Sequence, residues 1–373
     1  MRGGALDLRH AAAMARDWLT GAAFPFWFAH GIDRVHGGFH DTAGLEGAQI
    51  GGFKRTMVQA RQVYCFAHAG RMGWSGPWRA AVDIGLDTLE RHCRHPDFGF
   101  IHSLNEDCTP LETRRDLYDQ GFVALALVHA GEALGRVDLV WQARALLVAL
   151  DERWRDPRGG YFEGETRVQP HRRQNPHMHL FEAAVALARS PFAQAGDIDR
   201  VRALGTLFSE RLVQPGGCLP ELFGADWQPV AGGVAEPGHH FEWIWLLEEA
   251  RAAGGLDLAP LCKRLWEFAA AHGIDKGRDI VIDQIGCDGA VKAASARLWP
   301  QTERLKAALA TGPRGEPEAL RAFDSLAGYL ATPARGAFFD RQLADGTFEI
   351  KPARASSLYH LVCAFAALER HVA

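Results

Sequence analysis

The sequence predicts an all-α fold, an (α/α)6 barrel built from six helical hairpins, with short β-hairpins or loops at one end. Two observations predict it: polar or aromatic residues recur near the starts of apolar segments at separations of 57 to 61 residues, and buried and amphipathic helices alternate. The recurring positions are Arg61, Tyr118, His179, His239, Trp299 and His360.

Short glycine-containing stretches beside aromatic or apolar residues form a second marker of the same repeat. They occur at residues 37–40, 98–101, 159–162, 216–219 and 336–339. Paired glycines suit tight turns and aromatic residues favour extended backbone, so we expect short hairpins between the helices. Residues 278–283 keep the extended character without an aromatic residue and complete the set.

Periodicity gives the helices in order along the chain. Segments that are apolar nearly all round, such as 121–134, 179–188 and 357–368, are expected to be buried, whereas 139–154 has one polar face and is expected outside. The predicted helices lie near residues 5–20, 56–70, 75–92, 118–134, 137–153, 177–190, 196–210, 238–252, 257–272, 292–310, 315–331 and 354–371. Inner helices of such a ring start at one end, so their first turns line one cavity.

Composition and charge limit the classes of partner. No Ser-rich, Pro-rich or charged linker divides the chain, so we expect a single domain over residues 1–373. The formal net charge of -4, with acids and bases interspersed, argues against nucleic acid and against anionic membranes. The expected partner is a small uncharged molecule, and the protein is expected to be a monomer or homodimer.

The compartment is predicted from what the sequence lacks. Arg9, Arg16 and Asp17 interrupt the apolar residues at the start of the chain, so we expect no signal peptide, and no later run is apolar enough to span a bilayer. The seven cysteines include no C-x-x-C pair. We therefore expect reduced thiols and a cytoplasmic location.

Two of the recurring histidines begin the same local pattern, His-x-x-Glu. His179 precedes Glu182 and His239 precedes Glu242 by three residues, which places each pair on one helix face. Each glutamate is expected to orient its histidine for acid–base chemistry. Arg61, on an apolar helix, needs either an acidic partner or a substrate oxygen.

No metal or cofactor is expected. His177 and His179, like His239 and His240, are too close in sequence to face one ion from a helix, and H-E-x-x-H is absent. The phosphate-binding and dinucleotide-binding glycine motifs are absent as well.

The recurring positions sit in motifs that together resemble the N-acylglucosamine 2-epimerase superfamily, which also contains cellobiose 2-epimerases, mannose isomerases and sulfoquinovose isomerases. The motifs lie at residues 54–61, 116–122, 175–179, 236–243, 298–303 and 359–360. The resemblance spans almost the whole chain and implies an (α/α)6 barrel with metal-independent proton transfer beside a sugar carbonyl.

The resemblance also implies roles for individual residues. It assigns His239 and His360 as the acid–base pair, His179 and Arg61 as groups that hold the enediolate, and Glu242 as the acid that supports His239. It further implies a set of substrate-binding residues: Asn175, Tyr118, Trp299 and Glu303. Spacing alone leaves Tyr118 and Trp299 open to either packing or sugar stacking.

Within the superfamily, residues 238–243 resemble the mannose isomerase branch, so interconversion of D-mannose and D-fructose is the leading hypothesis. Alternatives are an N-acylglucosamine or other sugar 2-epimerase, and a sulfoquinovose isomerase, which needs cations near the sugar C6 such as Arg55, Lys292 or Lys351. From other classes, a glycosidase with two carboxylates or a non-catalytic sugar-binding protein stays open.

Overall fold

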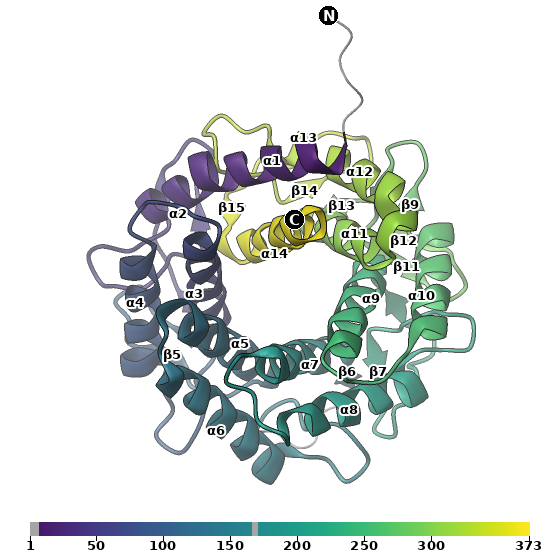
Figure 1. The fold of residues 1–373 in the computed structure, drawn as a ribbon, viewed down its shortest axis with the longest axis horizontal. Coiled ribbons are helices and arrows are strands. Elements are labelled where there is room, and N and C mark those ends of the chain that lie inside the picture. The colour runs from purple at the N-terminus through teal and green to yellow at the C-terminus, as the bar shows by residue number, and fades with distance from the viewer. Residues whose placement is uncertain (1–6, 166–170) are drawn as a thin grey trace, which may run out of the picture.

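The protein is a ring of helices in two layers around a central bore (Figure 1), seen in a computed structural model that describes residues 7–165 and 171–373. The inner helices are α3 (Thr56–Arg71), α5 (Leu117–Leu134), α7 (Gln174–Arg189), α9 (Pro237–Ala252), α11 (Leu298–Ala310) and α14 (Ala355–Val372). The outer helices are α1 (Leu8–Trp18), α2 (Phe24–His30), α4 (Trp78–Thr88), α6 (Val137–Trp154), α8 (Asp197–Leu207), α10 (Ala259–His272), α12 (Glu316–Ser325) and α13 (Ala327–Leu330).

Inner and outer helices alternate along the chain, as predicted. Each outer element is followed by an inner helix, and α14 packs against both α1 and α3, which closes the ring. The inner helices are buried on nearly all sides; α5 even buries the polar Asp119 and Gln120 among its apolar residues. The predicted (α/α)6 barrel is therefore confirmed.

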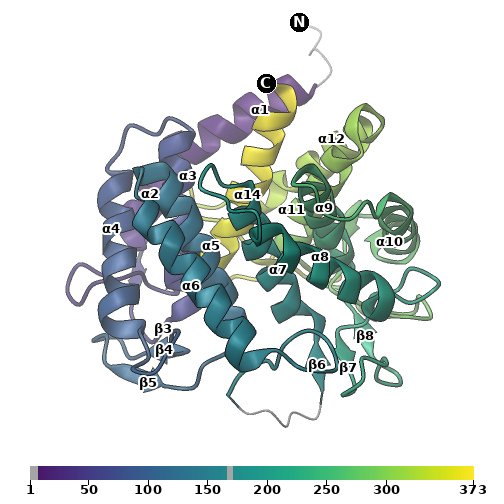
Figure 2. The ribbon, with the colours of Figure 1, turned by 60° about the horizontal axis from the view of Figure 1, so that its bottom comes forward.

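Very short antiparallel strands gather at the end of the ring where the inner helices begin, opposite the C-terminal end of α14 (Figure 2). Their sheets have the orders β15-β1-β2, β3-β4-β5, β6-β7, β12-β11-β8, β10-β9 and β13-β14. Strand β15, just before the last inner helix, pairs with β1 near the start of the chain, where Arg354 lies opposite Thr42. The sheets thus tie neighbouring repeats together at the mouth of the bore.

The bounds of these strands are β1 (Thr42–Ala43), β2 (Gln49–Ile50), β3 (Lys54–Arg55), β4 (Ser103–Leu104), β5 (Pro110–Glu112), β6 (Arg172–Arg173), β7 (Leu222–Phe223), β8 (Val234–Ala235), β9 (Ile274–Asp275), β10 (Ile280–Val281), β11 (Gln284–Gly286), β12 (Val291–Ala293), β13 (Ala296–Arg297), β14 (Arg341–Gln342) and β15 (Ala353–Arg354).

Five of the six glycine-containing or extended stretches share a structural feature: a side chain from the following inner helix holds their backbone. Gln59 accepts a hydrogen bond from the Phe39 amide and donates to its carbonyl, each at 2.8 Å. Equivalent side-chain contacts are those of Gln120 with Phe100, His177 with Tyr161, His240 with Leu219 and Gln301 with Val281. Each of these buried backbone N–H groups thereby has a hydrogen-bond acceptor at a place where no neighbouring strand provides one.

Three helix predictions differ from the structure at their ends. The first outer helix, predicted over 5–20, begins at Leu8 within the described residues and continues through a π-helical turn, Leu19–Ala23, into α2. The π-helical turn connects α1 directly to α2, and α2 contains Pro25 in its own first turn. The helix predicted over 292–310 begins at Leu298, because the preceding residues pair as β12 and β13, and the helix predicted over 315–331 divides into α12 and α13.

The prediction that all cysteines are reduced is wrong for one pair. Cys218 and Cys287 form a disulfide, which joins the loop before β7 to the loop after β11. Sequence spacing did not reveal it because 69 residues separate the two positions. Over the described ranges, the structure contains no helix with the length and apolar character that a membrane span requires.

Candidate active site

The first turns of the inner helices surround a cavity of about 260 Å³ at the strand end of the bore. All six recurring positions line it: Arg61, Tyr118, His179, His239, Trp299 and His360. Of the other predicted site residues, Asn175 and Glu242 also line the cavity. Residues 61, 179 and 360 are six positions into their helices, whereas the other three stand two or three positions in, so the repeat brings the side chains together without strict equivalence.

Each of the three histidines has its Nδ1 atom held by a carboxylate. The Nδ1 atoms of His179, His239 and His360 lie 3.0, 2.7 and 2.8 Å from oxygens of Glu182, Glu221 and Glu303, respectively. Because an imidazole that donates from Nδ1 has Nε2 as its remaining nitrogen, each ring keeps Nε2 for a molecule in the cavity. The arrangement supplies three oriented acid–base groups around one space.

Two of the predicted carboxylate roles need correction. Glu182 holds His179 as predicted, but Glu242 makes no hydrogen bond to His239, whose partner is Glu221 from the loop before β7. Glu303, predicted to bind substrate, is fully buried behind His360 and does not line the cavity. The helical spacing predicted that Glu182 and Glu242 lie near the histidines, but it did not predict the direction in which each imidazole ring turns.

Glu221 belongs to a second repeat that the sequence contained. Two residues after each backbone position that an inner helix holds stands a polar side chain, which contacts that same helix or the residue directly before it. The resulting contacts are Asp41 with Arg55, His102 with Asp119, Glu163 with Arg173, Glu221 with His239 and Asp283 with Arg297. An acid at that place beside a histidine on the next helix is the signal that would have found Glu221.

The three histidines are not electrostatically alike. Burial alone would lower the pKa of His239, but the carboxylates of Glu221, Glu236 and Glu242 raise it to about 9. Burial lowers the pKa of His179 to about 4 despite Glu182, and burial together with nearby cations holds the pKa of His360 well below its usual value. At neutral pH the cavity therefore contains one imidazolium and two neutral imidazoles.

Trp299 lies between the two histidines that differ most in charge. Its ring centroid is 4.8 Å from that of His239 and 5.5 Å from that of His360. The indole thus spaces the two imidazoles along one wall of the cavity and presents an aromatic surface of the kind that sugars stack on.

Arg61 is a buried cation with only neutral partners. Its guanidinium donates to the Ser356 carbonyl at 3.0 Å and to the Tyr118 hydroxyl at 2.9 Å, and lies 4.1 Å from the centroid of Phe122. Among the described residues no carboxylate forms an ion pair with it, and its Nε atom has no partner. A buried guanidinium without a counter-charge is suited to meet an anionic oxygen on a bound molecule.

Further polar atoms in the wall are also unsatisfied. Oδ1 of Asn175 and Oε1 of Glu242 are buried and have no hydrogen-bond partner. Burial and the neighbouring Glu303 raise the pKa of Glu242 well above its usual range. The amide oxygen and the carboxyl group are thus available to the hydroxyl groups of a polyol.

Two groups of side chains below the cavity have the proximity that a metal ion would require. They are His179 with Glu182 and Glu242, and Glu242 with Glu303 and His360. A lysine, Lys306, already places its ammonium 2.7 Å from an oxygen of Glu303. His177 and His240 instead hold loop backbone, because the Nε2 atom of each accepts a hydrogen bond from a backbone amide.

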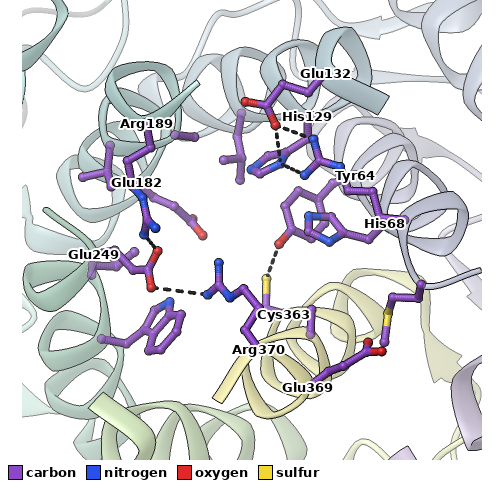
Figure 3. Close-up of a pocket in the computed structure, with 18 of the residues that line it drawn as sticks. Tyr64, His68, His129, Glu132, Glu182, Arg189, Glu249, Cys363, Glu369 and Arg370 are labelled. Atoms are coloured by element: carbon purple, nitrogen blue, oxygen red, sulfur yellow. Dashed lines mark hydrogen bonds and ion pairs between the residues drawn. The ribbon is translucent and has the colours of Figure 1, made fainter. Parts of the chain in front are cut away.

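The opposite mouth of the bore contains a larger cavity, about 490 Å³, shown in Figure 3. Ion pairs between inner helices surround it, with Arg71 of α3 on Glu132 of α5, and with Arg189 of α7 and Arg370 of α14 both on Glu249 of α9. Glu182 lines its floor while holding His179 of the first cavity. The charged side chains of this rim are thus paired with one another, whereas the buried Nε2 atom of His68 in its wall has no partner among the described residues.

Comparison with known proteins gives four consistent similarities. Residues 37–364 match the family described as N-acylglucosamine 2-epimerase. A protein of Rhizobium meliloti (strain 1021) named mannose-6-phosphate isomerase is 37% identical, with 98% of each chain covered. A cellobiose 2-epimerase of Bacteroides fragilis is 24% identical over 77% of this chain and 78% of that protein. The crystal structure of a D-mannose isomerase superposes with a TM-score of 0.88 at 19% identity, covering 98% of this chain and 99% of that one, which supports the fold.

Proposed function

Because this chain belongs to the N-acylglucosamine 2-epimerase family, and is therefore an isomerase or epimerase, we propose that it interconverts D-mannose and D-fructose. The relative named mannose-6-phosphate isomerase and the structural neighbour named D-mannose isomerase support the choice of an aldose–ketose reaction on a mannose-configured sugar. The observation that carries the proposal is a pair of histidines, His239 and His360, each held by a carboxylate on one wall of a sugar-sized cavity.

The complementary protonation states give the two histidines different first tasks. Neutral His360, with Nδ1 donated to Glu303, takes the proton from C2 of the open-chain aldose through Nε2. Imidazolium His239 donates a proton to the sugar oxygen, where negative charge develops. Transfer of this proton from His360 to C1, together with return of the O2 proton to His239, then completes the ketose and restores both histidines to their starting states.

Arg61 and His179 act on the enediolate intermediate. The uncompensated guanidinium of Arg61 attracts the anionic oxygen, and its interaction grows as charge develops, so it lowers the barrier more than it tightens ground-state binding. Neutral His179, fixed by Glu182, offers a second hydrogen bond to the sugar oxygens. Trp299 and Asn175 bind the sugar ring and its hydroxyl groups.

The rim of the cavity favours the unphosphorylated sugar. Three arginines line the cavity near its mouth, and each already has a carboxylate: Arg55 on Asp41, Arg297 on Asp283 and Glu236, and Arg354 on Asp340. A phosphate or sulfonate at C6 would compete with these carboxylates for the same cations. Lys292 and Lys351 do not line the cavity, so they give the sulfoquinovose alternative no support.

A purified sample incubated separately with D-mannose and D-mannose 6-phosphate tests the substrate. Formation of fructose from mannose, followed by a ketose assay, is the expected result. Turnover of the 6-phosphate alone would reject the free sugar as substrate, and absence of a ketose from both would reject the aldose–ketose reaction.

A sugar 2-epimerase is the second candidate, supported by the similarity to a cellobiose 2-epimerase and by the presence of two acid–base histidines. An epimerase returns the proton to C2 from the opposite face and produces no ketose. Reaction of mannose, N-acetylglucosamine and cellobiose in D2O, followed by NMR, separates the two, because only the epimerase places deuterium at C2 of a new aldose. Family membership disfavours the glycosidase and sugar-binding alternatives.

We further propose that the enzyme works in the cytoplasm, as a monomer or homodimer, without nucleic acid or membrane partners. The disulfide between Cys218 and Cys287 removes part of the support for this compartment, because cytosolic proteins seldom keep such bonds. Thiol titration of protein from the native cell extract tests the compartment, since seven reactive thiols after unfolding indicate a reducing environment and five indicate an oxidising one.

A further inference from the structure

Lys306 is a buried lysine on α11, one helical turn after Glu303, and its side chain is only 1% exposed. Burial opposes its charge, yet the surrounding carboxylates keep its pKa above the usual range. The buried side chain is therefore an ammonium ion at every physiological pH.

The ammonium ion is linked to the candidate base through a single carboxylate. Nζ of Lys306 lies 2.7 Å from Oε2 of Glu303, as a charge contact that is not aligned as a hydrogen bond. The other oxygen of Glu303, Oε1, lies 2.8 Å from Nδ1 of His360. Lys306, Glu303 and His360 thus form a chain that ends in the cavity.

Among the residues that the structure describes, no cation pairs directly with the carboxylates behind the other two histidines. The second oxygen of Glu182 accepts from the Tyr359 hydroxyl, and that of Glu221 accepts from the Gln174 amide at 3.1 Å. Both partners are neutral donors. The direct ion pair therefore distinguishes the carboxylate behind His360 from those behind His179 and His239.

Charged and titratable groups face this chain from each inner helix around it. They are Arg61 of α3, His179 and Glu182 of α7, His239 and Glu242 of α9, and Cys363 of α14. Three carboxylates, Glu182, Glu242 and Glu303, therefore share one buried layer in which Lys306 is the cation. Without Lys306, burial and the neighbouring carboxylates would all favour the neutral form of Glu303.

We propose that Lys306 is a positioning residue of the isomerase reaction: it keeps Glu303 ionised, and ionised Glu303 holds His360 in the Nδ1–H tautomer with the Nε2 lone pair toward the sugar. The proposal rests on the proposed function, in which His360 takes the C2 proton. An ionised carboxylate accepts only, so the proton shared with Nδ1 must stay on the imidazole. A protonated Glu303 can instead donate to Nδ1, which moves the ring proton to Nε2 and removes the base.

Lys306→Met tests this inference, because methionine fills a similar volume without the charge. The expected kcat is about 10- to 100-fold lower, with a smaller change in KM, as is usual when a group that orients a reactive side chain is lost. The acid limb of the pH–activity profile of Lys306→Met should also move to higher pH, since the pKa values of Glu303 and His360 both rise when the cation is removed. Lys306→Arg, which keeps the charge, should keep the wild-type pH profile.

The matched control is Lys263→Met, which removes a lysine that pairs with Glu267 on the outer surface and is 72% exposed. Its activity and pH profile should equal those of the wild type. A folded Lys306→Met variant with wild-type kcat and an unmoved acid limb overturns the proposal.

A double variant covers the case in which Lys306→Met does not fold. Lys306→Met with Glu303→Gln removes both buried charges, and its kcat should equal that of Glu303→Gln, because Lys306 acts only through Glu303. A kcat of the double variant clearly below that of Glu303→Gln overturns the proposal, and so does a double variant with wild-type kcat.

Nitrogen-15 NMR of the histidine rings gives a readout that does not depend on the substrate. His360, identified by loss of its signals in His360→Gln, should show a protonated Nδ1 and a bare Nε2 at pH 7 in the wild type, and a shift toward the other tautomer in Lys306→Met. If the wild type fails to isomerise mannose but the tautomer of His360 still depends on Lys306, the proposed function fails and the inference stands. If the tautomer of His360 is the same in the wild type and in Lys306→Met, the inference is overturned.

Discussion

Replacing Glu221 with glutamine removes the carboxylate nearest to His239 while preserving the shape of the side chain. Glu221 Oε1 lies 2.7 Å from His239 Nδ1, and its charge and hydrogen bond are the largest influences that raise the pKa of His239. The glutamine carbonyl can still accept from Nδ1, so the ring should keep its place. The expected change is a loss of imidazolium at neutral and alkaline pH.

The size of the effect follows from the two pKa values. The pKa of His239 is about 9 in the wild type and is expected near or below its usual 6.5 in Glu221→Gln. At pH 8, about 0.9 of the wild-type rings and about 0.03 of the variant rings are protonated, so activity that needs the imidazolium falls roughly 30-fold. At pH 5.5 both proteins are largely protonated at His239, and the deficit should nearly vanish.

Initial rates of ketose formation from pH 5 to 10 measure this effect. The wild type should lose activity as pH rises through about 9, and Glu221→Gln should lose it well below that. The control is Glu182→Gln, which disturbs the histidine whose pKa is already about 4 and should leave the alkaline limb near 9. A Glu221→Gln variant whose deficit is equal at all pH values would refute the assignment of His239 as the protonated acid.

Other expected outcomes test different parts of the site and fold. The folded-state pKa of His239 lies above its ordinary value, so the stabilisation from its pairing is complete below about pH 6.5 and is lost as pH rises through about 9. The urea midpoint of the wild type should therefore fall over that pH range, and the midpoint of Glu221→Gln should fall less. Arg61→Met should lower kcat about 100-fold with a smaller change in KM, and steady-state rates that change only in KM would contradict a contact with the enediolate. Cys218→Ser opens a disulfide that spans 69 residues and should lower the free energy of unfolding by up to about 4 kcal/mol; a urea midpoint equal to that of the oxidised wild type would contradict this. Dialysis against EDTA should leave activity unchanged, and a loss that Zn²⁺ or Mn²⁺ restores would show that the two histidine–glutamate groups bind metal.

The fold was predictable because the repeat imposes one sequence pattern six times. Buried inner helices require apolar residues on every face, and this is visible without knowledge of their neighbours. Five of these stretches marked the connections because they place a backbone amide where an inner-helix side chain, such as Gln59 or His240, can bind it. A repeated local requirement is therefore readable from sequence.

The convergence of the site residues on one cavity was also predictable, but not every pair of histidine and carboxylate was. A helix fixes which residues share a face, so Glu182 could be placed beside His179. Glu221 comes from a loop, 18 residues before His239, and its contact depends on how that loop folds over the next helix. Lys306 was missed for a related reason, because only the packed ring shows that the turn after Glu303 faces the bore.

Departures in the secondary structure have the same origin. Residues 292–297 could continue a helix, but β12 pairs with β11 in a short hairpin and β13 pairs with β14, which lies more than 40 residues further along the chain. The Cys218–Cys287 bond likewise depends on two loops meeting at the strand end. Long-range contacts decided these elements against a local preference.

Incubation of D-mannose in D2O with the purified enzyme, with the products followed by NMR, tests the central claim that histidines transfer the proton through an enediolate. A proton held by a histidine can exchange with solvent, so the account predicts fructose that carries deuterium at C1. Fructose without deuterium would indicate a direct hydride shift, and a deuterated aldose epimer without fructose would indicate epimerisation; either result would contradict the account.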